Sequence, residues 1–240
     1  MIGWINRTEL RRLVFEYPRT ATAVVFVNLV PLLGVLVGGW SVGLVLVFYW
    51  FETGIVLAFS LVAGLIAAEP ADTSDDDLIL HGLVESDARM RLRPEGPALH
   101  VRNVPVVLSI GVALGFFWVG HGIFVWFFAV PLAGGGGFAL DYWVWLALGG
   151  VVVGQASEFY SEQFVDGQYR HTDAKALTTS VIVRTVILHV TLVLGGVFVV
   201  FAAIVFPQSG AFLLAVLVTL KVPYDFAIRV DERDRDEANE

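Results

Sequence analysis

The chain contains no cysteine, and this absence removes several kinds of chemistry at once. It excludes disulfides, thiolate metal ligands, iron–sulfur clusters and a cysteine nucleophile. Lysine is nearly missing as well, since Lys175 and Lys221 are the only two, and arginine supplies most of the positive charge. Together with a net charge of −8, this scarcity of lysine indicates adaptation to high internal salt.

The familiar short motifs of enzymes are also missing. There is no HExxH zinc motif, no GxSxG nucleophile elbow, no Walker loop and no GxGxxG loop. The glycine run at 134–137 is not followed by the Lys-Ser/Thr pair that a phosphate-binding loop needs. The sequence therefore favours a protein without enzymatic activity, although it leaves the question open.

Long apolar runs are the main feature that is present. Hydrophobic residues make up 57% of the chain, charged residues only 16%, and the mean hydropathy is +0.75. Crossing the hydrocarbon of a bilayer takes about 20 mainly apolar residues. Suitable runs lie at 20–37, 41–67, 104–130, 141–157, 178–205 and 211–222. We therefore predict an all-α, polytopic membrane helix bundle with about six transmembrane helices, the first being a retained helix and not a cleaved signal peptide.

The arginines and lysines predict the orientation of these spans. Apart from Arg184, they fall in the N-terminal segment, after the second and fourth spans, and at the C-terminus, whereas the other connections contain none. Positively charged connections stay in the cytoplasm, so both termini are expected there and the protein is expected to be multi-pass in the cell membrane. Within the first loop, 79–93 is expected to form a short amphipathic helix whose arginines meet lipid headgroups. The predicted divisions are a cytoplasmic N-terminal segment (1–19), a first hairpin (20–67), a charged cytoplasmic loop (68–103), a second hairpin (104–157), a cytoplasmic loop (158–177), a third hairpin (178–224) and a disordered acidic tail (225–240).

A few polar residues interrupt the apolar spans, and ionisable groups at membrane depth are the first candidates for a functional site. They are Asn28, Glu52, His121, Arg184 and His189. At a rise of about 1.5 Å per residue, Glu52, His121 and His189 each lie near the middle of a hydrocarbon core about 30 Å thick. Three titratable side chains from three helices are thus predicted to meet at one site.

Several functions fit this site, and the spacing of its residues does not select among them. Two imidazoles and a carboxylate suit a divalent transition metal such as zinc or iron, or a proton relay, while haem bound by the two histidines is favoured less. These interpretations describe a transporter-like protein that handles metal or protons. A further alternative is an intramembrane hydrolase, in which a metal-bound water is the nucleophile and Glu52 is the general base. In the alternative, the protein is a non-catalytic membrane scaffold whose polar groups lock helix packing, each contributing about 0.6 kcal/mol.

Other residues are predicted to act in pairing and contact. Arg184 lies near the cytoplasmic end of its span, where Glu158 and Glu162 are its expected ion-pair partners. Gly111 and Gly115 make one side of the third span smooth, which suits close approach of a second copy or a membrane partner. The lipid bilayer is the expected surrounding partner, and no nucleic acid is expected.

The polar residues belong to a set of local strings. These are Asn28-Leu-Val-Pro-Leu-Leu-Gly34 with Trp40, Tyr49-Trp-Phe-Glu52, the run 117–124 that contains His121, Arg184-Thr-Val-Ile-Leu-His189, and Lys221 to Asp225. Over nearly the whole chain, these strings resemble an uncharacterised family of prokaryotic multispanning membrane proteins, a domain of unknown function. The resemblance implies that Glu52, His121, Arg184 and His189 belong to one recurring constellation, and it implies no activity.

The chain departs from that family at two positions. Ala113 and Gln155 stand near the places where relatives tend to have further histidines, one about two helical turns before His121 and one on the fourth span. If those histidines are metal ligands in relatives, this chain has lost a site or binds metal more weakly.

Overall fold

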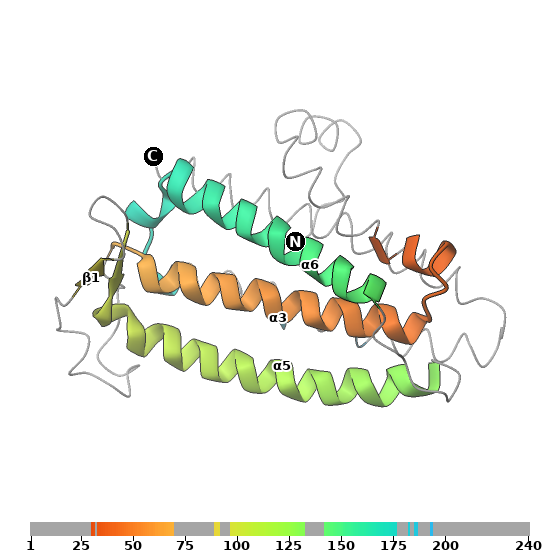
Figure 1. Cartoon of the computed structure of the whole chain (residues 1–240). Helices are drawn as coiled ribbons and strands as arrows, with labels where there is room; N and C mark the ends of the chain where they lie inside the picture. The colour runs from red at the N-terminus through yellow and green to blue at the C-terminus, as the bar shows by residue number, and fades with distance from the viewer. Residues whose placement is uncertain are drawn as a thin grey trace, which may run out of the picture.

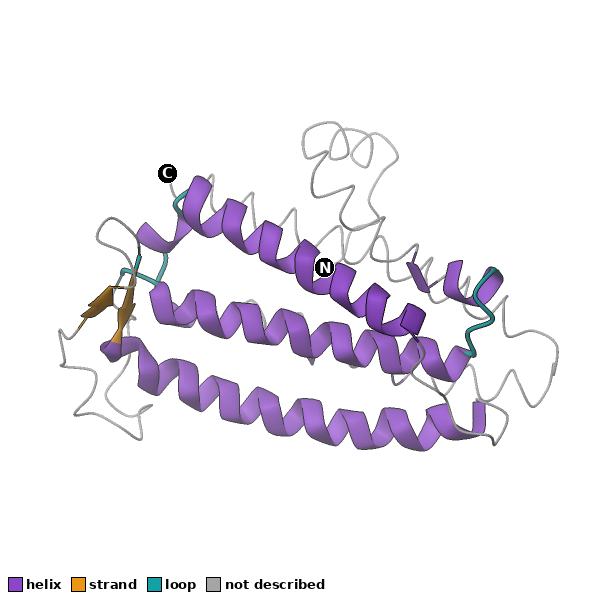
Figure 2. Cartoon of the chain, viewed as in Figure 1, coloured by secondary structure: helices purple, strands orange, loops and turns teal. Residues whose placement is uncertain are grey.

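The computed structural model describes residues 30–31, 33–69, 89–91, 97–132 and 142–176, together with 182, 185, 186 and 193. This part of the chain is mostly helical (Figure 2), as the sequence predicts. Its long helices are α3 (Val42–Ile66), α5 (Val104–Leu132) and α6 (Tyr142–Tyr160). In Figure 1, α3 lies between α5 and α6, and it packs against both of them. The central position of α3 means that most of its circumference is covered by protein.

Two of these helices, α3 and α5, are long and apolar enough to cross a membrane. With 25 and 29 residues, they extend over about 37 Å and 43 Å, more than the roughly 30 Å of hydrocarbon. The predicted first, fifth and sixth spans lie largely outside the described residues. The count of six spans and the side on which the termini lie therefore stay predictions.

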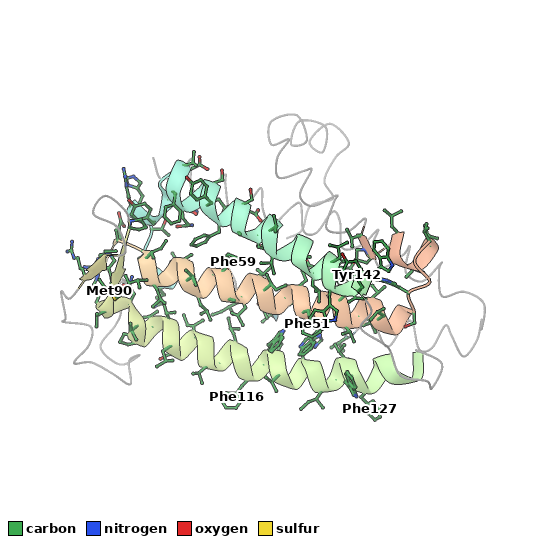
Figure 3. All side chains as sticks on the ribbon, viewed as in Figure 1. Phe51, Phe59, Met90, Phe116, Phe127 and Tyr142 are labelled. Atoms are coloured by element: carbon green, nitrogen blue, oxygen red, sulfur yellow. The ribbon has the colours of Figure 1, made fainter. Side chains whose placement is uncertain are left out.

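A stripe of large apolar side chains is exposed along α5. Figure 3 shows Phe116 and Phe127 pointing away from α3, and they are 77% and 74% exposed. The other members of the stripe are Leu108, Val112, Val119 and Ile123. Soluble proteins rarely leave a continuous apolar surface of this length in water, so the stripe fits a helix that faces lipid.

The start of α3 follows from its local sequence. Ser41 is the N-cap, and its hydroxyl accepts a hydrogen bond from the backbone N–H of Leu44 at 3.1 Å. Gly39 has a φ of +69°, a left-handed conformation that favours glycine. The ring of Trp40 then packs over Gly34, where a side chain would collide with it. The chain thereby reverses direction just before α3.

The other end of α3 meets a small hairpin, and we call this the basic end because Arg89, Arg102 and Arg170 lie there. Strand β1 (Arg89–Arg91) pairs antiparallel with β2 (Ala98–His100). The chain then passes through η2 (Val101–Asn103) into α5. Asn103 donates from Nδ2 to the carbonyl oxygens of Gly64 and Ala67, at 3.0 Å and 2.8 Å. The expected helix over 79–93 is thus wrong at 89–91, because these residues pair as a strand with 98–100 in a hairpin.

Helix α6 continues beyond the predicted end of its span at 157. It reaches Tyr160 and passes into a π-helical turn, η3 (Ser161–Val165), followed by the short η4 (Gln168–Arg170). The backbone N–H of Ala68 donates to the carbonyl of Tyr169 at 2.7 Å. The basic end therefore joins the ends of α3 and α6 to the start of α5. We call the opposite end, which carries Trp40, Tyr142 and Trp143, the aromatic end.

Candidate functional site

A pair of tryptophans joins the middle of α3 to the middle of α5. The indole rings of Trp50 and Trp118 stack with centroids 4.4 Å apart and planes at 10°. Each indole N–H donates to the backbone carbonyl of the other tryptophan, both at 2.9 Å. The arrangement is reciprocal, and since the helices run antiparallel it fixes their register along the axis.

A glycine one helical turn after each tryptophan makes room for the other tryptophan's ring. A Cβ on Gly122 would lie 2.5 Å from Trp50, and a Cβ on Gly54 would lie 2.8 Å from Trp118. Both helices therefore carry the same pattern, a tryptophan followed four residues later by glycine. We call these four residues the Trp–Gly lock. Small residues at such crossings let membrane helices approach closely.

Glu52 and His121 flank the Trp–Gly lock at matching depth. Glu52 lies ten residues after the first residue of α3, and His121 lies eleven residues before the last residue of α5. At about 1.5 Å per residue, these positions are roughly 15 Å and 17 Å from the aromatic end. Both side chains are only 5% exposed. The structure thus places both ionisable groups out of solvent and at similar distances from the aromatic end, and their membership of one site stays a prediction.

The two side chains leave their helices in different directions. Glu52 follows Trp50 by two residues, about 200° around the helix, so it leaves α3 on a different face from the Trp–Gly lock. Phe59 is seven residues further on, hence on the same face as Glu52, and its ring lies 5.7 Å from that of Phe159 on α6. Glu52 is therefore turned toward the α6 side. On α5, His121 stacks on Phe124, with ring centroids 6.1 Å apart.

Three of the predicted residues, His189, Arg184 and Asn28, lie outside the described residues. Their meeting with Glu52 and His121 therefore stays a prediction. In the part of the chain that the structure describes, no three His, Asp or Glu side chains gather closely enough to hold a metal. Two described residues of the same apolar segment are informative: Ile182 packs against Leu57 and Leu114, and Thr185 is buried.

The remaining predicted residues are placed as follows. Glu158 lies on the last turn of α6 and Glu162 in η3, and both are half-buried; their predicted partner Arg184 is outside the described residues. Gly111 faces α3, where a Cβ would come within 3.2 Å of Leu61, whereas Gly115 has open space around it. A partner at this face stays a prediction, and Gly111 already serves packing within the chain.

Sequence reasoning missed the Trp–Gly lock and the burial of Gln155 on α6. The signal for the lock was a tryptophan and glycine spaced by four on two consecutive spans. Gln155 is buried on α6, at 8% exposure, on the face that also carries Val144, Leu148 and Val151. Its position was noticed in the sequence, but only as the place of a missing histidine.

At the basic end, the titratable group with a perturbed pKa is His100. The side chain is buried at the end of β2. Burial lowers the pKa of His100 below its usual 6.5, and the positive charges of Arg102 and Arg89 lower it further. His100 therefore stays neutral at physiological pH. This group is a structural part of the hairpin, well away from Glu52 and His121 along the helices.

Comparison with known proteins identifies a family whose function is not known. No curated protein and no solved structure matches the chain. A family model does match, over residues 14–240, which is nearly the whole length and includes every candidate residue above. The chain belongs to a family of unknown function (DUF6498).

Proposed function

We propose that this protein is a multi-pass membrane protein of six transmembrane helices that binds a proton or a divalent transition metal at a buried site. The site would be formed by Glu52, His121 and His189, between helices that carry no other ionisable group at that depth. Both termini would lie on the side of the basic end, in the cytoplasm, because positively charged connections stay there. The protein would act as a transporter-like membrane protein that handles this ion.

The placement in a bilayer is supported by the surface of the helices. Large apolar side chains cover the outer side of α5, and Trp143 and Trp145 are exposed near the start of α6. Tryptophans are enriched at membrane interfaces. Trp143 and Tyr160 are 17 residues apart along α6, or about 26 Å, which is close to the thickness of the hydrocarbon.

The observation that carries the proposal is the burial of Glu52 and His121 at one depth. A charged residue at the centre of a membrane helix costs about 2.5–3.5 kcal/mol by insertion measurements. A site with no function would avoid this cost by using apolar residues, which are abundant elsewhere in both helices. Ionisable residues at such depth usually belong to ion or proton pathways.

The chemistry of the donors limits what the site can bind. A carboxylate and imidazoles are ligands for zinc, iron and similar divalent metals. The same groups exchange protons, because histidine titrates near neutral pH. With Glu52 and His121 alone the site has two donors, so a metal needs His189 as a third, whereas a proton does not.

The test separates these two ions. Chelator-treated protein in mild detergent is titrated with zinc and with ferrous iron by calorimetry, and the same protein in liposomes is tested for proton flux with an internal pH-sensitive dye. We expect binding or flux in the unchanged protein and its loss in Glu52→Gln and His121→Gln. His171→Gln, a change at an exposed histidine of the basic end, should behave like the unchanged protein. The proposal would be contradicted if the unchanged protein showed no metal binding and no proton flux.

A second candidate, a scaffold whose polar groups hold the helices together, is favoured by the Trp–Gly lock. The lock contains two interhelical hydrogen bonds and a stacked ring pair, so the region has a clear packing role. If Glu52→Gln and His121→Gln lower the melting temperature but leave metal titration and proton flux at the level of the unchanged protein, the scaffold is the better description.

A further inference from the structure

Apolar clusters lie on both sides of Glu52, and two small ones, around Leu57 with Leu114 and around Ala67 with Val107, are on the basic side. The two sides differ in the size of these clusters and in the face of α6 beside them. Toward the aromatic end, the core is a continuous apolar cluster that includes every residue from Leu44 to Phe48 on α3. Its other buried members are Trp40, Tyr49, Val125, Val144, Leu148 and Val151. A hydrated ion that crossed this layer would lose its water and gain few polar partners from the described residues. Among the described helices, the cluster therefore forms an apolar layer about 15 Å thick on that side of Glu52.

The face of α6 that packs toward α3 changes character along its length. Val144, Leu148 and Val151 are buried and apolar, and Gln155 then continues the same face. Gln155 lies one turn before Phe159, which contacts Phe59. It is therefore placed between the depth of Glu52 and the basic end. Buried amide groups need hydrogen bonds, and a polar path can supply them.

Polar side chains continue from Gln155 to the end of the helix. Glu158 and Glu162 follow at three and seven residues, which places them near the same face, and both are half-buried. Gln163 is only 2% exposed and lies in the π-helical turn η3. π-helical turns within helices occur frequently at functional sites.

Gln163, just after the end of α6, supplies separate evidence that the polar face continues into η3. Its Nε2 donates to Oε1 of Gln168 at 2.7 Å, while its own Oε1 is buried and has no hydrogen-bond partner among the described residues. Exchanging the amide oxygen and nitrogen would only move the unmatched atom to Nε2. One polar atom of Gln163 is thus left for a water molecule, or, when that atom is the oxygen, for a passing cation.

We propose that the Glu52 site exchanges its ion with the basic end, along the polar face of Gln155, Glu158, Glu162 and Gln163, and is closed toward the aromatic end. This inference rests on the proposed ion site and adds the side from which the ion enters. A proton or hydrated cation moves between carboxylates and amides that replace its water in succession.

The experiment uses the cysteine-free chain, in which a single introduced cysteine is the only thiol. Gln155→Cys is compared with Leu148→Cys, a buried position on the same face of α6. A membrane-impermeant methanethiosulfonate cation is added to right-side-out or inverted membrane vesicles, and unreacted thiol is then counted with a maleimide dye in detergent. Arg170→Cys and Tyr142→Cys, both exposed, mark the basic and the aromatic side.

The cysteine thiolate attacks the sulfenyl sulfur of the reagent and displaces methanesulfinate, and the thiolate forms where water reaches the cysteine sulfur. We expect complete loss of maleimide labelling for Gln155→Cys when the reagent is on the side that also modifies Arg170→Cys, and no loss from the other side. Leu148→Cys should keep its full labelling from both sides. Gln163→Cys is the second variant, expected to behave like Gln155→Cys, in case the first does not fold.

Three results would overturn the inference. They are modification of Leu148→Cys from either side, modification of Gln155→Cys from the side of Tyr142→Cys, and protection of both glutamine variants from both sides. None of these results depends on metal titration or proton flux in the cysteine-free chain. An ion site can therefore survive a failed access route, and a hydrated route can be found beside a Glu52 that binds nothing.

Discussion

Replacing Gly122 with alanine tests the Trp–Gly lock directly. The new Cβ would lie 2.5–2.9 Å from three atoms of the Trp50 indole, against the 3.4 Å at which ordinary contact begins. The Trp50 ring cannot withdraw freely, because it is stacked on Trp118 and donates to its carbonyl. Moving the ring would weaken the stacking, worth about 0.5–1.5 kcal/mol, and the hydrogen bond, worth about 0.6 kcal/mol between membrane helices.

The expected magnitude follows from two opposing terms. Overpacking in a well-packed core costs about 1–3 kcal/mol, whereas glycine to alanine within a helix gains up to about 1 kcal/mol. Gly120→Ala is the matched control, since a Cβ there meets nothing within 4 Å and keeps only the favourable term. We therefore expect Gly122→Ala to be less stable than Gly120→Ala by about 1–3 kcal/mol.

The measurement is unfolding in mixed micelles with increasing sodium dodecyl sulfate, followed by circular dichroism. Tryptophan fluorescence in the native state would report whether the stacked pair has separated. A double variant adds a second check: Trp50→Ala removes the ring that Gly122→Ala collides with, so the two changes should be strongly non-additive. Equal stability of Gly122→Ala and Gly120→Ala, with unchanged fluorescence, would refute the close contact on which this reasoning depends.

Other predictions concern the ends of the helices. Asn103→Ala should lower the free energy of unfolding by about 1–3 kcal/mol, because the carbonyls of Gly64 and Ala67 lose their shared donor; a midpoint equal to that of the unchanged protein would contradict this. Ser41→Ala should cost about 1 kcal/mol through the lost N-cap of α3, measured in the same titration. His100 has a lowered pKa in the folded state, so below pH 6.5 the unfolded state binds more protons and stability should fall as pH falls from 6.5 toward the lowered value. In His100→Gln, the plot of melting temperature against pH should be flatter below pH 6.5 than in the unchanged protein. An unchanged slope would show that another group is responsible.

The long helices could be predicted from the sequence to within a few residues. The runs 41–67 and 104–130 correspond to α3 and α5, because an uninterrupted apolar run of that length has few alternatives to a membrane helix. The end of α6 was harder to place. Glu158 is charged and was therefore expected in a loop, but a helix continues as long as its backbone hydrogen bonds are formed, and hydropathy does not report on these.

The strand at 89–91 could not have been predicted from its own residues. Arg89-Met-Arg91 alternates polar and apolar side chains, and a short pattern of this kind fits one turn of an amphipathic helix as well as a strand. Its pairing with 98–100 decides the matter. That information lies outside the segment itself.

The positions of the site residues along their helices could be predicted from the sequence, whereas their contacts with other helices could not. The depth of Glu52 and His121 needed only the helix rise and the ends of the spans. The Trp–Gly lock needed the register between two helices, which hydropathy does not contain. Only the contact of Trp50 with Gly122 and of Trp118 with Gly54 reveals it.

The Trp–Gly lock stabilises the helix pair, whereas the buried ionisable groups Glu52 and His121 destabilise it. These opposite effects explain why the lock and the two groups are neighbours. One charge at the centre of a membrane helix costs about 2.5–3.5 kcal/mol. Two interhelical hydrogen bonds at about 0.6 kcal/mol each and a stacked aromatic pair at about 0.5–1.5 kcal/mol offset most of that cost. Glu52 lies two residues from Trp50 and His121 three residues from Trp118, so this stacked and hydrogen-bonded contact between α3 and α5 is found where these helices carry their least favourable groups. A rigid pair at that point also keeps Glu52 and His121 at one depth, whatever movement α6 makes beside them.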